Sequence, residues 1–221
     1  MTANEKLSKI IGLGLGRTGT TSLQTAFESL GLQPVYHMST IIERNAIDEL
    51  DQWRKIGLEG GTEDDIRKLL DSYPVVLDYP PAMYPELLYK TYPDAKFILT
   101  VRDPSKWSQS VKNTIMKAIE EAKKAAPSIS PPLKAALEFG DETINGWYHS
   151  GRMFTHGEEE FLKHIERVKR AVPADKLLIY DVREGWDRLA DFIGIEKPAQ
   201  PFPHVNDTAQ YQENVLKSIG K

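Results

Sequence analysis

The feature that most constrains this chain is a glycine-rich stretch between an apolar run and an amphipathic run. Residues 11–21 read Ile-Gly-Leu-Gly-Leu-Gly-Arg-Thr-Gly-Thr-Thr. Glycines let the backbone turn tightly and bring consecutive N–H groups close to an anion. A helix that follows adds its unpaired N–H groups and the positive end of its dipole. The stretch predicts a strand, loop and helix that bind a phosphorylated nucleotide, with a tight turn that binds no ligand as the alternative.

Five short apolar runs have the pattern of strands, and each is bounded by glycine, proline or polar residues. They cover residues 8–13, 34–37, 75–78, 96–101 and 176–180. Helical spacing of apolar residues marks residues 21–30, 85–92, 104–126, 158–171 and 186–193. Strands that alternate with helices predict an α/β fold with three layers, in which a parallel sheet has helices on both faces. Because no linker or repeat divides the chain, we expect one domain over residues 1–221.

Ligands of such sheets gather at the carboxyl ends of the strands. This rule places Gly16, His37, Asp78, Arg102 and Tyr180 around one crevice. Residues 117–157 are expected to form a helical insertion packed on the sheet. A turn between two helices is expected at residues 131–132, which are both proline.

Composition excludes several classes of site. The chain has no cysteine, which rules out disulfides, thiolate zinc sites and cysteine nucleophiles. A net charge of −4 without a polybasic run disfavours partners such as nucleic acid or an anionic membrane. His149, His156 and His164 lack the spacing of metal ligands, so no metal is expected. Without a long apolar segment near residue 1, we expect a cytoplasmic protein.

Two general nucleotide-binding patterns overlap in the loop. Gly14, Gly16 and Gly19 satisfy the dinucleotide fingerprint, which also needs an acidic residue at the end of the second strand. No carboxylate follows that strand before Glu43, which disfavours an NAD(P)-binding oxidoreductase. As a P-loop, the stretch lacks the usual lysine, which disfavours a small-molecule kinase that would need magnesium and a nucleoside triphosphate. A non-catalytic nucleotide-binding protein is a further alternative.

The loop resembles the one with which sulfotransferases bind the 5′-phosphosulfate of 3′-phosphoadenosine 5′-phosphosulfate. Its common form is Pro-Lys-Ser-Gly-Thr-Thr-Trp, so Arg17 stands where lysine is frequent and Ser22 where tryptophan is frequent. Arginine keeps the positive charge and can donate two hydrogen bonds to an anion. The resemblance implies that seven consecutive residues bind this co-substrate: Gly16, Arg17, Thr18, Gly19, Thr20, Thr21 and Ser22.

Further motifs extend the resemblance over nearly the whole chain. Residues 97–104 look like the family's strand that ends in an arginine, and Ser110 lies on the following helix. The resemblance implies that Arg102 and Ser110 bind the 3′-phosphate of the co-substrate. Tyr180 ends a strand similar to the one whose tyrosine approaches the adenine. The family's C-terminal Arg-Lys-Gly segment is missing here, so the way in which the nucleotide is covered is not predicted.

The resemblance also implies a mechanism. The acceptor is an unidentified small molecule with a hydroxyl or an amine, and Arg17, Thr20 and Thr21 stabilise the departing nucleotide without a metal. Asp78 stands where the family has a histidine base and is the first candidate for the base, with His37 the second. Their ordinary pKa values are about 3.9 and about 6.5, which favours His37 unless burial raises that of Asp78. Packing at a strand end is the alternative role for His37. The oligomeric state is not predicted.

Overall fold

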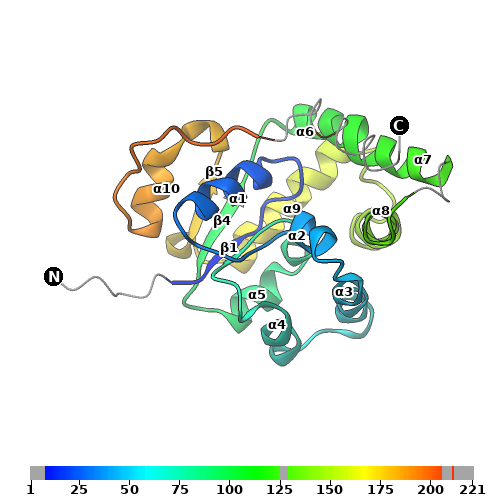
Figure 1. The fold of residues 1–221 in the computed structure, drawn as a ribbon, viewed down its shortest axis with the longest axis horizontal. Coiled ribbons are helices and arrows are strands. Elements are labelled where there is room, and N and C mark those ends of the chain that lie inside the picture. Colours follow the sequence, from blue (N-terminus) through cyan, green and yellow to red (C-terminus); the bar gives the residue numbers. More distant parts are fainter. Residues whose placement is uncertain (1–7, 125–128, 206–210, 212–221) are drawn as a thin grey trace.

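A parallel sheet organises the fold in the computed structural model, which describes residues 8–124, 129–205 and 211 (Figure 1). Its five strands pair in the order β2-β3-β1-β4-β5. The bounds are β1 Ile10–Gly12, β2 Val35–Tyr36, β3 Val75–Val76, β4 Lys96–Thr100 and β5 Leu177–Tyr180. Every described pairing is parallel. The predicted α/β class, with helices on both faces of a parallel sheet, is confirmed.

Alternate residues of the strands face opposite sides of the sheet. Ile10 and Ile98 belong to one apolar cluster, together with side chains of α1 (Thr20–Ser29) and α10 (Trp186–Ile193). Ile11 belongs to a larger cluster on the other face. The helices that pack there include α5 (Pro85–Thr91), α6 (Pro104–Val111) and α9 (Gly157–Ala171). Both faces of the sheet are therefore buried, as expected for a parallel sheet.

The region between β2 and β3 is helical, which the apolar runs did not predict. It contains α2 (Met38–Glu43), α3 (Ile47–Glu59) and α4 (Glu63–Leu70). Thr62 begins α4 with a capping box, because its hydroxyl accepts from the N–H of Asp65 and the Asp65 side chain accepts in return. The pattern Thr-x-x-Asp before an apolar residue was thus available in the sequence.

The predicted helix over residues 104–126 corresponds to three consecutive segments in the structure, of which α6 is the first. After α6 come a π-helical stretch, η2 (Lys112–Met116), and α7 (Lys117–Lys124), while residues 125 and 126 lie outside the described residues. Next come α8 (Pro131–Phe139) and a second π-helical stretch, η4 (Gly140–Tyr148). The two prolines occupy the first turn of α8, where a missing N–H costs nothing.

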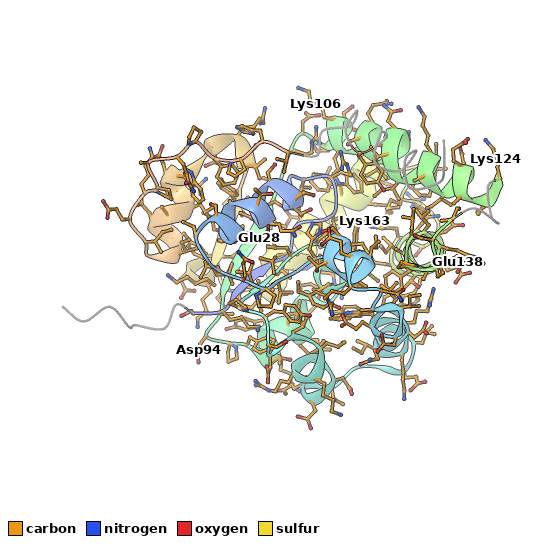
Figure 2. All side chains as sticks on the ribbon, in the orientation of Figure 1. Glu28, Asp94, Lys106, Lys124, Glu138 and Lys163 are labelled. Carbon is orange, nitrogen blue, oxygen red and sulfur yellow. The ribbon has the colours of Figure 1, made fainter. Side chains whose placement is uncertain are left out.

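These helices extend to one side of the sheet. Figure 1 shows α3, α7 and α8 at the end of the molecule away from α10. Figure 2 shows Lys124 and Glu138 at the same end. Short 3₁₀ turns complete the order: η1 (Pro81–Met83), η5 (Ala174–Lys176) and η6 (Val182–Glu184). None of the helices in the described part of the chain has the length and apolar character needed to cross a membrane.

Gly14 lies where the glycine-rich loop leaves β1 and passes over the end of β4. A Cβ added to Gly14 would lie 1.7 Å from Thr100 Oγ1 and 2.9 Å from the Thr100 backbone nitrogen. Only glycine fits there, because the Thr100 backbone belongs to the central sheet and cannot move aside alone.

We predict that Gly14→Ala lowers the free energy of unfolding by about 2 kcal/mol, the usual cost of overpacking. Gly140→Ala is the matched control, because its added Cβ meets only Ile119 Cδ1 at 3.9 Å. Denaturant unfolding measures both variants. Equal stability of Gly14→Ala and the wild type would show that this close approach does not constrain the loop.

Candidate functional site

Buried side chains hold the backbone carbonyls of the glycine-rich loop. His164 of α9 donates from Nε2 to the Leu13 carbonyl at 2.6 Å. Trp107 of α6 donates from Nε1 to the Gly16 carbonyl at 2.9 Å. The indole of Trp107 is fixed in turn by stacking on Phe161, with 4.8 Å between ring centroids. Two helices on one face of the sheet therefore set the direction of the loop's peptide groups.

Two further carbonyls of the loop have donors as well. Arg102, which follows β4, donates from Nη1 to the Arg17 carbonyl at 2.9 Å. The Thr18 hydroxyl donates to the Leu15 carbonyl at 2.7 Å and also contacts the Thr100 hydroxyl. The helix that follows the loop, α1, begins at Thr20 and has no side-chain cap. N–H groups at the start of a helix favour an anion.

Arg17, Arg102 and Ser110 lie together at this end of the sheet. Arg17 has a positive φ of 72° and donates from Nε to Ser110 Oγ at 3.4 Å. Its guanidinium also lies over the ring of Tyr211, 4.8 Å from the centroid. Burial lowers the pKa of Arg102, partly opposed by Asp181. Two arginines and a buried hydroxyl thus surround the loop, a donor set that fits phosphate esters.

His37 and Asp78 form a buried pair beside the first residue of α1. His37 Nε2 lies 3.3 Å from Asp78 Oδ2 and 3.1 Å from Thr20 Oγ1. Asp78 has a positive φ of 65°, and a Cβ added to Gly16 would lie 3.1 Å from its Oδ1. The ends of β1, β2 and β3 therefore bring the two predicted base candidates into contact with each other and with the loop.

Burial changes the proton affinity of both groups. It lowers the pKa of His37, although the Asp78 carboxylate opposes this shift. Burial also raises the pKa of Asp78, opposed by His37, the backbone N–H of Tyr79 and Arg17. We conclude that the pair is held as a neutral imidazole beside a carboxyl group of raised proton affinity.

Three predicted binding residues use their hydroxyls within the protein. Besides Thr18, Ser22 Oγ accepts from the Val205 N–H at 3.1 Å and lies 3.3 Å from the Val205 carbonyl. The Tyr180 hydroxyl donates to the Gly185 carbonyl at 2.6 Å, and its side chain is fully buried. Their roles toward a nucleotide stay predictions, as do those of the other predicted residues.

The segment after α10 returns to the loop, which the motifs did not indicate. Trp186 Nε1 donates to the Gln200 carbonyl at 2.8 Å, and the Gln200 amide donates to Ser29 Oγ at 2.9 Å. With the contact between Val205 and Ser22, this path brings the segment along α1. A family motif alone gave no sign of it, because these partners lie far apart in sequence.

A second buried polar chain lies under the loop. The Tyr79 ring packs against Gly16, and its hydroxyl lies 3.2 Å from His149 Nε2. His149 Nδ1 lies 3.5 Å from Glu160 Oε2, while the other oxygen of Glu160, Oε1, pairs with Arg152 and Lys163. His149 and His164 were predicted not to bind a metal. Within residues 8–124, 129–205 and 211, no three acidic or histidine side chains are grouped to hold a metal ion.

Comparison with known proteins identifies one family. A family described as "Sulfotransferase domain" matches residues 9–211. The chain is also similar to "Ava biosynthesis cluster protein M" of Aspergillus versicolor, with 29% identity over 213 residues. That alignment covers 89% of this chain and 80% of the relative.

The pKa of His149 predicts an acid-sensitive fold. Burial lowers this pKa to about 4, opposed by Glu160. An unfolded histidine has a pKa of about 6.5, so between these values only the unfolded state takes up the proton. We expect the free energy of unfolding to fall by about 3 kcal/mol, from this group alone, as the pH falls from 6.5 to 4.

Denaturant unfolding across this range checks the prediction in wild type and His149→Gln, which should lose less stability on acidification. His156→Gln, at an exposed histidine, is the control and should follow the wild type. Identical slopes for all three proteins would contradict the assignment to His149.

Proposed function

Because the chain belongs to the sulfotransferase family, we propose that it moves a sulfuryl group from 3′-phosphoadenosine 5′-phosphosulfate to a small-molecule acceptor. The acceptor group is a hydroxyl or an amine. The observation that carries the proposal is the convergence of Arg17, Arg102 and Ser110 on a loop whose carbonyls are bound from below. The relative from Aspergillus versicolor is named for a biosynthesis cluster, which supports a small molecule as acceptor.

The loop residues bind the co-substrate in this proposal. Arg17 and the N–H groups at the start of α1 hold the 5′-phosphosulfate, together with Thr20 and Thr21. Arg102 and Ser110 hold the 3′-phosphate. Cationic and N–H donors fixed before the reaction stabilise charge without reorganising, which is the main contribution that a protein makes to such transfers.

The transfer itself needs an acceptor oxygen or nitrogen in line with the bond that breaks. A lone pair of the acceptor forms the new bond to sulfur. The bond between sulfur and the bridging phosphate oxygen breaks, and its electron pair stays on adenosine 3′,5′-bisphosphate. Arg17 and Thr20 stabilise the growing charge on that oxygen. The acceptor's proton leaves to a base, for which Asp78 is the first candidate and His37 the second.

The other nucleotide-binding readings have less support in the fold. In the dinucleotide fold the first two strands are neighbours, whereas here β3 lies between β1 and β2. His37 follows β2 in place of the acidic residue that a dinucleotide ribose needs. A kinase would require a cation in place of the missing P-loop lysine. The cytoplasmic location, the absence of nucleic-acid and membrane partners, a single domain and metal-free transfer stay predictions.

We predict that Arg17→Ala and Arg102→Ala each weaken binding of adenosine 3′,5′-bisphosphate by about 10- to 100-fold, the loss of a charge-assisted hydrogen bond. Calorimetric titration of the bisphosphate without magnesium measures this, and ATP, with and without magnesium, and NADPH are titrated separately for comparison. Arg188→Ala is the control, because Arg188 is an exposed residue of α10 that pairs with Glu184. Binding of ATP only with magnesium, or of NADPH alone, would contradict the proposal.

We predict that Asp78→Asn lowers kcat by about 100-fold or more, because an amide cannot take up the acceptor's proton. Its affinity for the bisphosphate should change less than threefold, since the donors to the phosphates are intact. Turnover is measured with an acceptor found by screening hydroxyl and amine compounds with labelled co-substrate. Near-normal turnover of Asp78→Asn would exclude Asp78 as the base.

A further inference from the structure

The ring of His37 is held in one protonation form by its surroundings. The backbone N–H of Ser39 donates to His37 Nδ1 at 3.1 Å. Ser39 Oγ lies 3.0 Å from the same nitrogen and donates its proton to Gln24 Oε1 at 3.2 Å. A backbone N–H cannot reverse its direction, so Nδ1 must accept. The neutral ring therefore carries its proton on Nε2.

The Nε2 proton is directed at the site. Nε2 lies 3.3 Å from Asp78 Oδ2 and 3.1 Å from Thr20 Oγ1, so both oxygens face the same N–H group. A nitrogen that already carries a proton has no lone pair for the acceptor's proton. His37 would first have to lose its place as donor to both neighbours, and Nδ1 is blocked by Ser39.

Asp78 can take up the acceptor's proton at one of its carboxylate oxygens, whereas neither ring nitrogen of His37 can. Its Oδ1 is buried and has no hydrogen-bond partner among residues 8–124, 129–205 and 211. A buried carboxylate oxygen of this kind is rare, and a catalytic role is one explanation for it. Arg17, Glu28 and Glu43 are the charged groups around the pair. Tyr79 and Tyr211 are the other titratable side chains close to Asp78.

We propose that Asp78 is the general base and that His37 is a positioning residue, whose Nε2–H fixes the carboxylate against the first residue of α1. This inference rests on the proposed sulfuryl transfer. The acceptor's proton passes to the Asp78 carboxylate while the new bond to sulfur forms. Thr20 Oγ1 accepts from the same Nε2–H group. Its hydroxyl proton can therefore be donated to the bridging oxygen of the leaving group.

Two substitutions of His37 separate positioning from base catalysis. Glutamine keeps an N–H donor at the end of its side chain but takes up no proton at neutral pH, whereas leucine has neither ability. We expect His37→Gln to keep kcat within about tenfold of the wild type and His37→Leu to lose about 100-fold, a typical loss for a disrupted general base. Equal losses of about 100-fold in both variants would overturn the proposal.

A readout without turnover accompanies the kinetics. Nitrogen chemical shifts of ¹⁵N-histidine-labelled protein report the tautomer of His37, assigned by comparison with His37→Gln. We expect the neutral ring with its proton on Nε2 at pH 7 and above, while kcat rises with pH as Asp78 loses its proton. A proton on Nδ1, or a midpoint of kcat that follows protonation of His37, would overturn the assignment.

Bisphosphate titration distinguishes this failure from failure of the proposed function. We expect wild type and both His37 variants to bind adenosine 3′,5′-bisphosphate with affinities within about threefold, because its phosphates lie on the arginines. A wild type that does not bind the bisphosphate would refute the co-substrate, and the proposal on Asp78 and His37 would fall with it. Normal binding with equal kinetic losses refutes the role of His37 alone.

Discussion

The direction of the peptide groups after β1 is the constraint on which the site depends. Leu13, Gly16 and Arg17 each turn a carbonyl toward a side chain of another element. A buried carbonyl left without a donor would cost about 1–3 kcal/mol, so the contacts define one loop conformation. Because each peptide group has its N–H opposite its carbonyl, fixing the Leu13 and Gly16 carbonyls on the protein side turns the N–H groups of Gly14 and Arg17 to the opposite side, whereas the Thr18 N–H bonds to the Leu15 carbonyl at 3.3 Å. The site is thus produced by the packing of α6 and α9 under the loop.

The sequence allowed the fold class to be predicted, and also the edge of the sheet at which the candidate residues meet, because both depend on local patterns. Alternating strands and helices indicated the parallel sheet, and parallel strands bring His37, Asp78 and Arg102 to one edge whatever the strand order. The order itself, with β3 between β1 and β2, is not a local property. The helices after β2 were missed because their charged faces obscure the apolar period, as in α4, where Ile66, Leu69 and Leu70 are the buried residues.

The orientation of hydroxyls is where motif reasoning reached its limit. A motif places Thr18, Ser22 and Tyr180 near a nucleotide, but each hydroxyl has a partner within the protein. Whether a threonine faces inward depends on a residue such as Thr100, which lies 82 positions away. The contacts of Trp107 with Gly16 and of His164 with Leu13 were unpredictable for the same reason. Sequence alone does not show which polar atom a packed ring directs at the backbone.

The long separation between the loop and its donors has a consequence for how the protein is made. Gly16 and its donor are 91 positions apart, and Leu13 and its donor are 151 positions apart. During synthesis, β1 and α1 leave the ribosome long before α9, so the nascent loop lacks the side chain that orients its first carbonyl. Loops closed over such distances form late, after the entropy of chain closure has been overcome. In the proposed function, anion binding is therefore a property acquired near the end of folding, and we expect a nascent chain that ends before α9 to lack it.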